Sequence, residues 1–271
     1  MLTWVGSASA QQVEQERRAQ STRAEPEPVP YWDEGAARPF LSLAPALGAV
    51  SNLDLALGWG KPHWMWGGIE GTALSTFDFG AVSVGPRVAL LLADLSVKRR
   101  LTHAYRHPFL ARRASYSASD VEDGPGESAD YGAWDVSLWG LVPLPFGYGI
   151  YELAGTWVDG VPAGHDLFEE YQRVVIRGDR ILAIRLGLSA WLVRDVLGAG
   201  LLVEWLSAED RGVTWRLGPS LDCQFSDHLS ASAVYTLPVS APDSLGAWTG
   251  AWGTLRLRYT WASGEPRPEF P

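Results

Sequence analysis

Charged residues recur at every second position in several segments of this chain, with apolar residues between them. Arg256 and Arg258 are one example, because Leu255, Leu257 and Tyr259 alternate with them. If such segments are strands of a barrel, the charged face points into its interior. The charged set on these faces comprises six acidic and seven basic residues: Glu70, Asp78, Asp135, Glu152, Glu204, Asp222, Arg87, Lys98, Arg100, Arg185, Arg216, Arg256 and Arg258.

The sign of these charges bears on what the interior could do. A strongly selective pore carries rings of one sign, so the near balance favours arginines that brace the interior through carboxylate pairs. A conducting channel with weak selectivity remains the alternative. We expect the following residues to line the lumen: Arg87, Arg185, Glu204, Arg216, Asp222, Arg256 and Arg258.

The five histidines predict no metal site, and we expect no cofactor. His103 and His107 are close in sequence, but residues four apart on a strand are about 13 Å from each other, too far to share a metal. His63 lies among the tryptophans of segment 59–66 and could form a ligand platform. A belt of interfacial aromatic residues is the simpler interpretation.

The segment from Val213 to Phe225 shows which element positions these residues. Its apolar and polar residues alternate without a fault, which only a strand of period two produces. Trp215 and Phe225 share the apolar face ten residues apart, or about 33 Å along the strand. With a tilt of roughly 40°, this projects to about 25 Å, the height of the apolar band of an outer-membrane barrel. The segment therefore predicts a transmembrane β-strand.

Similar alternation extends from Phe40 to Trp261 and predicts an all-β, antiparallel transmembrane barrel over residues 39–261. The run at 169–177 is the weakest strand of this set, and residues 49–66 are interpreted as loop-like. The irregular segment 107–130 is the longest expected loop. The expected strands number about twelve and lie near residues 40–48, 68–79, 81–93, 95–105, 133–142, 148–158, 169–177, 181–193, 198–206, 213–225, 228–237 and 250–261.

The overall composition narrows the class of protein. The chain has 271 residues and a net charge of −9, which argues against nucleic acid as a partner. It has no run of 18 apolar residues, so we expect no transmembrane helix. Lysine occurs only at positions 61 and 98, although soluble proteins normally carry much lysine on their surface. The single cysteine, Cys223, rules out an intrachain disulfide framework.

Two terminal regions stand outside the predicted barrel. Ala8-Ser9-Ala10 fits a secretory cleavage site, so residues 1–10 are expected to be the remnant of a signal peptide. Residues 11–38 are rich in Gln, Glu, Arg and Pro, which predicts a disordered leader. Residues 262–271 form a C-terminal tail.

The polar faces of the strands indicate whether the apolar faces point outward or into the barrel. A soluble barrel of the lipocalin type also alternates, but with its apolar face inward. Its water-facing surface would then carry many long charged side chains. Here the polar faces are rich in small residues such as Ser42, Gly48, Gly187, Ser220 and Ser232. They suit a crowded interior, with the apolar faces against lipid.

Over residues 38–261 the chain resembles bacterial outer-membrane β-barrel proteins as a class. The closing segment from Leu255 to Trp261 is similar to the aromatic-ended last strand that the barrel-insertion machinery recognises in that class. Here residues 262–271 follow the final aromatic residue, which departs from the usual pattern. The resemblance implies a secreted precursor, the outer membrane of a Gram-negative cell, and outer-membrane lipid and the insertion machinery as partners. The oligomeric state stays open.

His228 and Ser230 share one strand face in the sequence His228-Leu229-Ser230. This resembles the His-x-Ser pairing of outer-membrane phospholipases, in which the imidazole deprotonates the hydroxyl. An asparagine orients the histidine in that class, and Asn52, the only asparagine here, is far away in sequence. Both residues also fall on the expected lumen face, whereas a lipid hydrolase needs its nucleophile at the bilayer. We expect no enzymatic activity and no catalytic residue.

Three functions remain, in order of preference. The first is a small channel or passive transporter of unknown substrate, and the second is a structural or interaction barrel with a charge-filled lumen. A membrane-embedded lipid hydrolase is the third. Within the lumen, we expect Arg256 and Arg258 to pair with Asp222 or Glu204.

The expected strand count also has a consequence for orientation. Counting back from a periplasmic C-terminus places segment 107–130 on the periplasmic side, where such barrels usually have short turns. The weak run at 169–177 is the first candidate for a miscounted strand.

Overall fold

The computed structural model describes residues 37–61, 65–122, 128–226 and 228–263. The expected signal-peptide remnant lies outside these residues. So do nearly all of the expected leader, His63 and Trp64 of the aromatic segment, and residues 264–271 of the tail. Within the described residues, no helix is long and apolar enough to cross a membrane.

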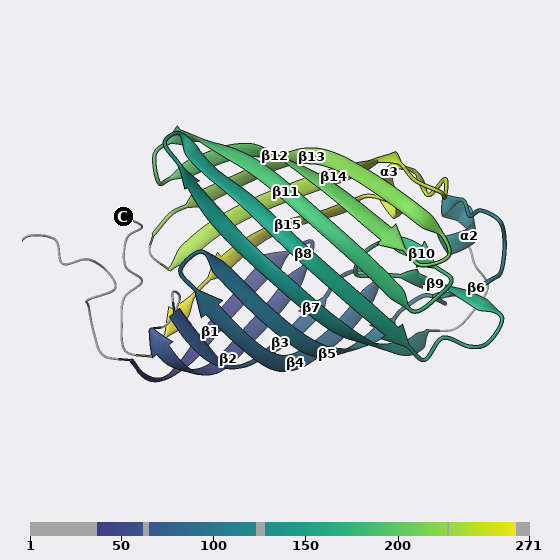
Figure 1. The fold of residues 1–271 in the computed structure, drawn as a ribbon, viewed down its shortest axis with the longest axis horizontal. Coiled ribbons are helices and arrows are strands. Elements are labelled where there is room, and N and C mark those ends of the chain that lie inside the picture. The colour runs from purple at the N-terminus through teal and green to yellow at the C-terminus, as the bar shows by residue number, and fades with distance from the viewer. Residues whose placement is uncertain (1–36, 62–64, 123–127, 227, 264–271) are drawn as a thin grey trace, which may run out of the picture. The chain divides into compact units, whose positions relative to one another are not determined.

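Twelve long antiparallel strands form the wall of a closed barrel in this part of the chain, which confirms the predicted fold class (Figure 1). They are β1 (Arg38–Gly48), β2 (Ser51–Lys61), β3 (Met65–Ser75), β4 (Phe79–Leu90), β5 (Ala93–Ala104), β7 (Ala129–Leu144), β8 (Gly147–Asp159), β11 (Arg180–Val193), β12 (Leu197–Ala208), β13 (Gly212–Gln224), β14 (Leu229–Ser240) and β15 (Trp252–Tyr259). Each pairs with the next wall strand along the chain, and β15 pairs with β1 to close the barrel. The short strand β16 (Trp261–Ala262) extends this seam by pairing with Leu43 and Ser42.

Two errors cancel in the predicted strand count. The segment interpreted as loop-like contains β2, where Leu53, Leu55 and Leu57 alternate with smaller or polar residues. Conversely, the run at 169–177 is no wall strand. It contains part of a hairpin formed by β9 (His165–Glu169) and β10 (Val174–Ile176), and β9 also pairs with β6 (Phe109–Ala111).

Removing the run at 169–177 from the wall resolves the problem of orientation, because it changes the count of strands between segment 107–130 and the closing strand. The three long connections, at 105–128, 160–179 and 241–251, all leave the wall at one end, here called the loop end. They carry β6, β9, β10 and the short helices α2 (Ala118–Glu122) and α3 (Gly246–Thr249), which gather at that end (Figure 1). The opposite end has short turns and holds the start of β1 beside Ser263, whose amide donates to the Leu41 carbonyl over 2.8 Å.

Most large apolar residues of the wall point outward, and most small or charged residues point inward. This arrangement follows the period of two and is the reverse of a soluble barrel with an apolar interior. Leu217 is 44% exposed and Leu257 is 46% exposed, whereas Arg216 is 1% exposed. Other large apolar side chains exposed on the outer face are Leu57, Ile69, Val84, Leu188 and Leu201.

The larger apolar core lies inside the barrel at the loop end, and a smaller cluster of Phe40, Ala56, Trp66 and Ala89 lies at the opposite end. Leu167, Val174 and Ile176 of the hairpin pack against inward residues of the wall such as Ile181 and Leu206, and all five are buried. Burial of one such side chain contributes about 1.5–3 kcal/mol. The hairpin is therefore held in the lumen by packing as well as by polar contacts.

The other face of the hairpin is covered by the long connections. Phe168 and Val175 pack against Leu110, Tyr116 and Leu245, which come from the connections at 105–128 and 241–251. Both faces of this small sheet are buried, so its strands lack the alternation that marks a wall strand.

Candidate functional site: the lumen and its closure at the loop end

A row of alternating charges crosses four neighbouring strands on the inner face of the wall. Glu152, Arg185, Glu204 and Arg216 lie directly opposite one another on β8, β11, β12 and β13. Arg185 Nε contacts Glu204 Oε1 over 2.6 Å, and Arg185 Nη1 contacts Glu152 Oε2 over 2.9 Å. Arg216 binds the second oxygen of Glu204. Three of the seven expected lumen residues, Arg185, Glu204 and Arg216, thus belong to one chain of ion pairs.

A second cluster surrounds Arg87 on β4. Its Nε donates to Asp94 Oδ2 on β5 over 2.8 Å, and its Nη1 binds Glu70 on β3. Lys98 of β5 binds the other oxygen of Glu70. The described ion pairs of this cluster balance two cations with two carboxylates, as the sequence predicted for the lumen as a whole.

The remaining three expected residues lie apart from both clusters. Asp222 accepts a hydrogen bond from the Tyr148 hydroxyl. Arg256 Nε contacts the Ser232 hydroxyl over 3.2 Å, and Arg258 Nη2 contacts Asp54 Oδ2 over 3.3 Å.

The predicted pairing of Arg256 and Arg258 with Asp222 or Glu204 is therefore wrong. Glu204 is engaged by Arg185 and Arg216 instead. Arg258 lies opposite Ala46 of β1, so its long side chain passes over a small residue and reaches Asp54 on β2. The missed strand β2 explains the error, because its carboxylate was not assigned to the wall. Asp78 also leaves the expected wall set, since it lies in the turn between β3 and β4 and binds Arg173 over 2.9 Å.

Arginines of the wall also hold the hairpin between β9 and β10. Arg100 Nη1 of β5 contacts Glu169 Oε1 over 2.8 Å, and the Tyr131 hydroxyl of β7 contacts the same oxygen over 3.1 Å. Arg185 Nη2 donates to Gln172 Oε1 over 2.6 Å. Glu169 is fully buried and Gln172 is 3% exposed, so these bonds lie inside the barrel and away from bulk water.

Arg216 is the point at which the wall, the hairpin and a loop meet. Its Nη2 donates to the carbonyls of Gln172 over 2.8 Å and of Arg173 over 2.9 Å. Its Nε donates to the carbonyl of Gly250 over 2.9 Å, in the connection at 241–251. Because the side chain is buried, each of these acceptors would lose its partner if the guanidinium group were removed.

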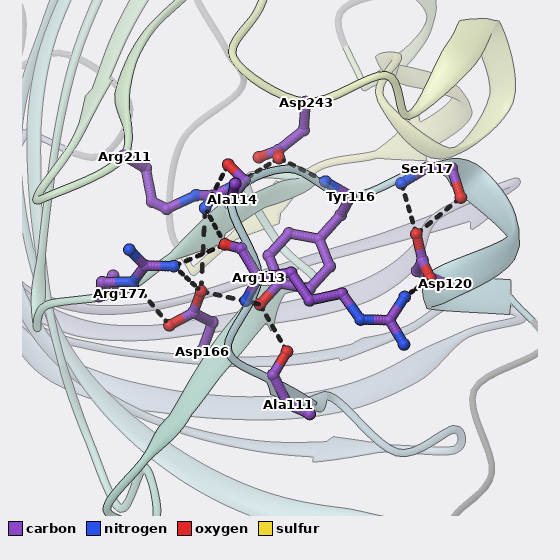
Figure 2. A network of polar contacts seen from close by, with 10 residues as sticks. All are labelled: Ala111, Arg113, Ala114, Tyr116, Ser117, Asp120, Asp166, Arg177, Arg211 and Asp243. Atoms are coloured by element: carbon purple, nitrogen blue, oxygen red, sulfur yellow. Dashed lines mark hydrogen bonds and ion pairs between the residues drawn. The ribbon is translucent and has the colours of Figure 1, made fainter.

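A separate network locks the long connections to each other, as Figure 2 shows. Asp166 of β9 accepts hydrogen bonds from the Tyr116 hydroxyl over 2.8 Å and from Arg177 Nη2 over 2.9 Å. Arg211, in the turn after β12, binds Asp243 and donates from Nη1 to the Arg113 carbonyl over 3.0 Å. The network joins four connections above the hairpin, so the hairpin is held on both of its sides.

Glu170, at the tip of the hairpin, is a buried acid with a poorly satisfied carboxyl group. Its Oε2 atom has no hydrogen-bond partner among the described residues. Arg173 Nη1 lies 4.0 Å from it, within ion-pair range but too far for a hydrogen bond. Burial raises the pKa of Glu170 to about 8, and the charge of Arg173 offsets this only in part. The carboxyl group is therefore mostly protonated at neutral pH.

The other candidate chemistry of the sequence is not assembled into a site by the described contacts. His228 Nδ1 contacts the Thr260 carbonyl over 2.9 Å, and Ser230 lies opposite Arg258. Of the aromatic segment, Trp59 is exposed on the outer face, whereas Trp66 is buried inside beside Phe40. In the described part of the chain, no group of three or more His, Cys, Asp or Glu residues could hold a metal ion.

Sequence reasoning missed the residues that attach the hairpin. Glu169 and Gln172 fell within the run assigned to the wall, yet the polar sequence Glu169-Glu170-Tyr171-Gln172-Arg173 breaks the alternation there. That break was the available signal for a loop. Nothing local in the sequence shows that a wall arginine such as Arg216 binds backbone carbonyls of a distant loop.

Comparison with known proteins gives structural likeness alone. No family model and no curated protein matches the sequence. The structure is similar to the β domain of the Bordetella autotransporter BrkA, with 15% identity, 84% of this chain and 99% of that one covered, and a TM-score of 0.42. It is similar to CdiB from Acinetobacter baumannii, with 9% identity, coverages of 84% and 60%, and a TM-score of 0.43. For the KdgM porin the identity is 6%, the coverages are 83% and 99%, and the TM-score is 0.37. The chain thus has outer-membrane β-barrel proteins as its structural neighbours, at similarities too low to carry its function.

Proposed function

We propose that the protein is an outer-membrane β-barrel that forms a small channel or passive transporter, closed at its loop end by the β9–β10 hairpin. The observation that carries this proposal is the seating of the hairpin inside the lumen. Its polar atoms bind arginines that come from three separate wall strands, β5, β11 and β13. A solute can cross such a barrel only when this contact opens.

The placement in a membrane rests on the outer face. A continuous apolar surface on a closed barrel is costly in water and stable in lipid. Leu217, Leu257 and their neighbours on the outer face provide such a surface here. We expect the protein to fractionate with outer membranes, to resist carbonate extraction and to migrate differently in detergent gels before and after boiling. A heat-insensitive protein in the soluble fraction would contradict the proposal.

Swelling of proteoliposomes in neutral solutes of increasing size tests the channel. The parent protein should give slow swelling, because the hairpin occupies the lumen. A variant in which residues 165–176 are replaced by a short Gly-Ser linker should swell quickly with small solutes. A matched control replaces the turn at 194–196, at the opposite end of the barrel, with a short Gly-Ser linker, because no described contact joins this turn to the hairpin.

A structural or interaction barrel with a filled lumen is the second candidate. The charge row from Glu152 to Arg216 favours it, because this row would brace the wall in the absence of any transport. The swelling assay separates the two: a filled barrel remains impermeable after the hairpin is removed, provided that it still shows the heat-dependent gel shift.

A further inference from the structure

Beneath the hairpin, the lumen contains a second feature that the closure itself does not require. A cavity of about 150 Å³, which opens to solvent, lies between β3, β4, β5, β7, β8 and the tip of the hairpin. Its volume limits any ligand to a small molecule. Its lining combines hydroxyl groups, paired charges and one aromatic ring, so it has the composition of a site for a polar molecule.

The hydroxyl groups of the cavity outnumber its other polar groups. Ser96 and Ser137 are hydrogen-bonded to each other over 2.9 Å across β5 and β7. A hydroxyl group both donates and accepts, and its hydrogen rotates to suit a partner. The hydroxyl-bearing side chains of the lining are Thr72, Ser83, Ser96, Ser137, Thr156 and Tyr171.

The charged groups of the lining are already neutralised by protein partners. Arg100 binds Asp135 over 2.7 Å and Glu169 over 2.8 Å, and Lys98 binds Glu70. A charged ligand would have to compete with these pairs, which are partly or fully withdrawn from water. The cavity therefore disfavours both anions and cations as ligands.

The carboxylates of these pairs still have capacity to accept hydrogen bonds. Glu152 receives Arg185 Nη1 at one oxygen, Oε2, over 2.9 Å. Asp135 receives Arg100 and the Thr156 hydroxyl, the latter over 2.8 Å. A carboxylate offers about four lone-pair sites, so Glu152 in particular can accept from the hydroxyl group of a neutral ligand.

Tyr171 supplies a flat surface at the hairpin side of the cavity. Its ring lies 5.0 Å from the Arg100 guanidinium carbon, and the side chain is 38% exposed although the flanking residues Glu170 and Gln172 are buried. An exposed ring with a polar tip offers both an apolar face and a hydroxyl group to a bound molecule.

We infer that this cavity binds a neutral, hydroxyl-rich small molecule of monosaccharide size, through Tyr171, Glu152 and the Ser96–Ser137 pair. The inference deepens the proposed function and rests on it, because a solute that crosses the lumen would pass this cavity when the hairpin moves. Binding itself requires only that the ligand reach the cavity, and it can be measured without transport.

The test is saturation-transfer NMR on the full chain in detergent, with D-glucose as the probe and gluconate and glucosamine as charged analogues of similar size. We expect a saturable signal for glucose and weaker signals for both analogues. Tyr171→Ala and Ser137→Ala should each weaken glucose binding severalfold. Tyr105→Ala is the matched control, because Tyr105 is 46% exposed and does not line the cavity.

Three results would overturn the inference: no saturable glucose signal, tighter binding of either charged analogue, or equal loss in the Tyr171 and Tyr105 variants. If Tyr171→Ala loses the heat-dependent gel shift, Ser137→Ala alone decides. A parent that binds no glucose, while its hairpin-shortened variant conducts, refutes this inference and leaves the proposed function intact. A parent that binds glucose, while its hairpin-shortened variant stays impermeable, refutes the proposed channel and leaves the inferred binding site intact.

Discussion

The two ends of the barrel interior differ in what fills them, although their strands follow the same pattern. At the loop end, Leu167 and Ile176 of the hairpin are fully buried against the wall, and Glu169 is fully buried beside Arg100. At the opposite end, which holds the start of β1 and Ser263, the inward Arg258 keeps a side chain that is 34% exposed, near the small residue Ala46. The wall encloses an interior, and the hairpin of one long connection folds back into it at the loop end.

The largest difference between the ends should appear when one buried arginine is removed. Arg216→Met leaves three backbone carbonyls without their described partner and half of the Glu204 carboxylate unpaired. Breaking a buried pair in this way costs about 3–5 kcal/mol. We expect the midpoint of the heat-dependent gel shift to fall strongly.

The matched control for that substitution is Arg258→Met, at the end of the barrel opposite the loop end. Its pair with Asp54 is long, at 3.3 Å, and water reaches the side chain. Because this pair is partly exposed, it should contribute less than the fully buried pair of Arg216, so the gel-shift midpoint should move less. Equal effects of the two substitutions would mean that the two ends are equally filled.

A smaller effect should distinguish the two faces of a single strand. Leu217→Arg places a charge on the outer face and should cost roughly 2–4 kcal/mol if the position lies near the bilayer midplane. Ser220→Arg lies on the inner face, which is partly accessible, and should cost less. Unfolding by urea in lipid vesicles measures both. Equal tolerance would show that the faces are misassigned.

The smallest effect is a pH dependence confined to the hairpin. Because the pKa of Glu170 is raised to about 8 when the hairpin is seated, the seated state binds its proton more tightly than the released state does. Its stability is therefore highest below the ordinary pKa of glutamate, about 4.3, and falls as the pH rises from there to about 8.

Hydrogen exchange of residues 165–176 measures this dependence. Glu170→Gln is the control, because it keeps the shape of the side chain and does not titrate. Exchange in the parent should accelerate relative to the control between pH 5 and 8, while the exchange of β12 should not. Other charged groups near Glu170 are Asp78 from the β3–β4 turn, Arg106 from the connection after β5, and Glu169 and Arg173 from the hairpin. A parent and a control that exchange alike at every pH would contradict the assignment to Glu170.

Much of the fold could be predicted from sequence because alternation is a local property. Val213 to Phe225 shows which face each side chain occupies before any partner strand is known. Even the missed strand β2 carries this signal, in Leu53, Leu55 and Leu57. The hairpin could not be placed in this way, because both faces of its strands are buried, by the wall on one side and by loops on the other.

The contacts of the candidate site could likewise be predicted only in part. Arg185, Glu204 and Arg216 could be expected to share the lumen face, since alternation fixes the face and adjacent strands fix the neighbour. The acids expected for Arg256 and Arg258 were wrong because β2, which carries Asp54, was not assigned to the wall, and Arg258 reaches that acid across Ala46 of β1. Contacts of that kind follow from tertiary structure alone.

The central claim is that ion pairs between the wall and the hairpin keep the lumen closed, and single-channel conductance of Glu169→Arg tests it most directly. The new guanidinium would lie beside Arg100 in a fully buried position, so the hairpin should leave its seat. The control is Glu209→Arg at the same end, where the existing pair with Arg180 is long and exposed. We predict a closed parent, a closed control and open-channel conductance for Glu169→Arg. A parent that already conducts as an open pore, or a folded Glu169→Arg barrel that stays closed, would contradict the account.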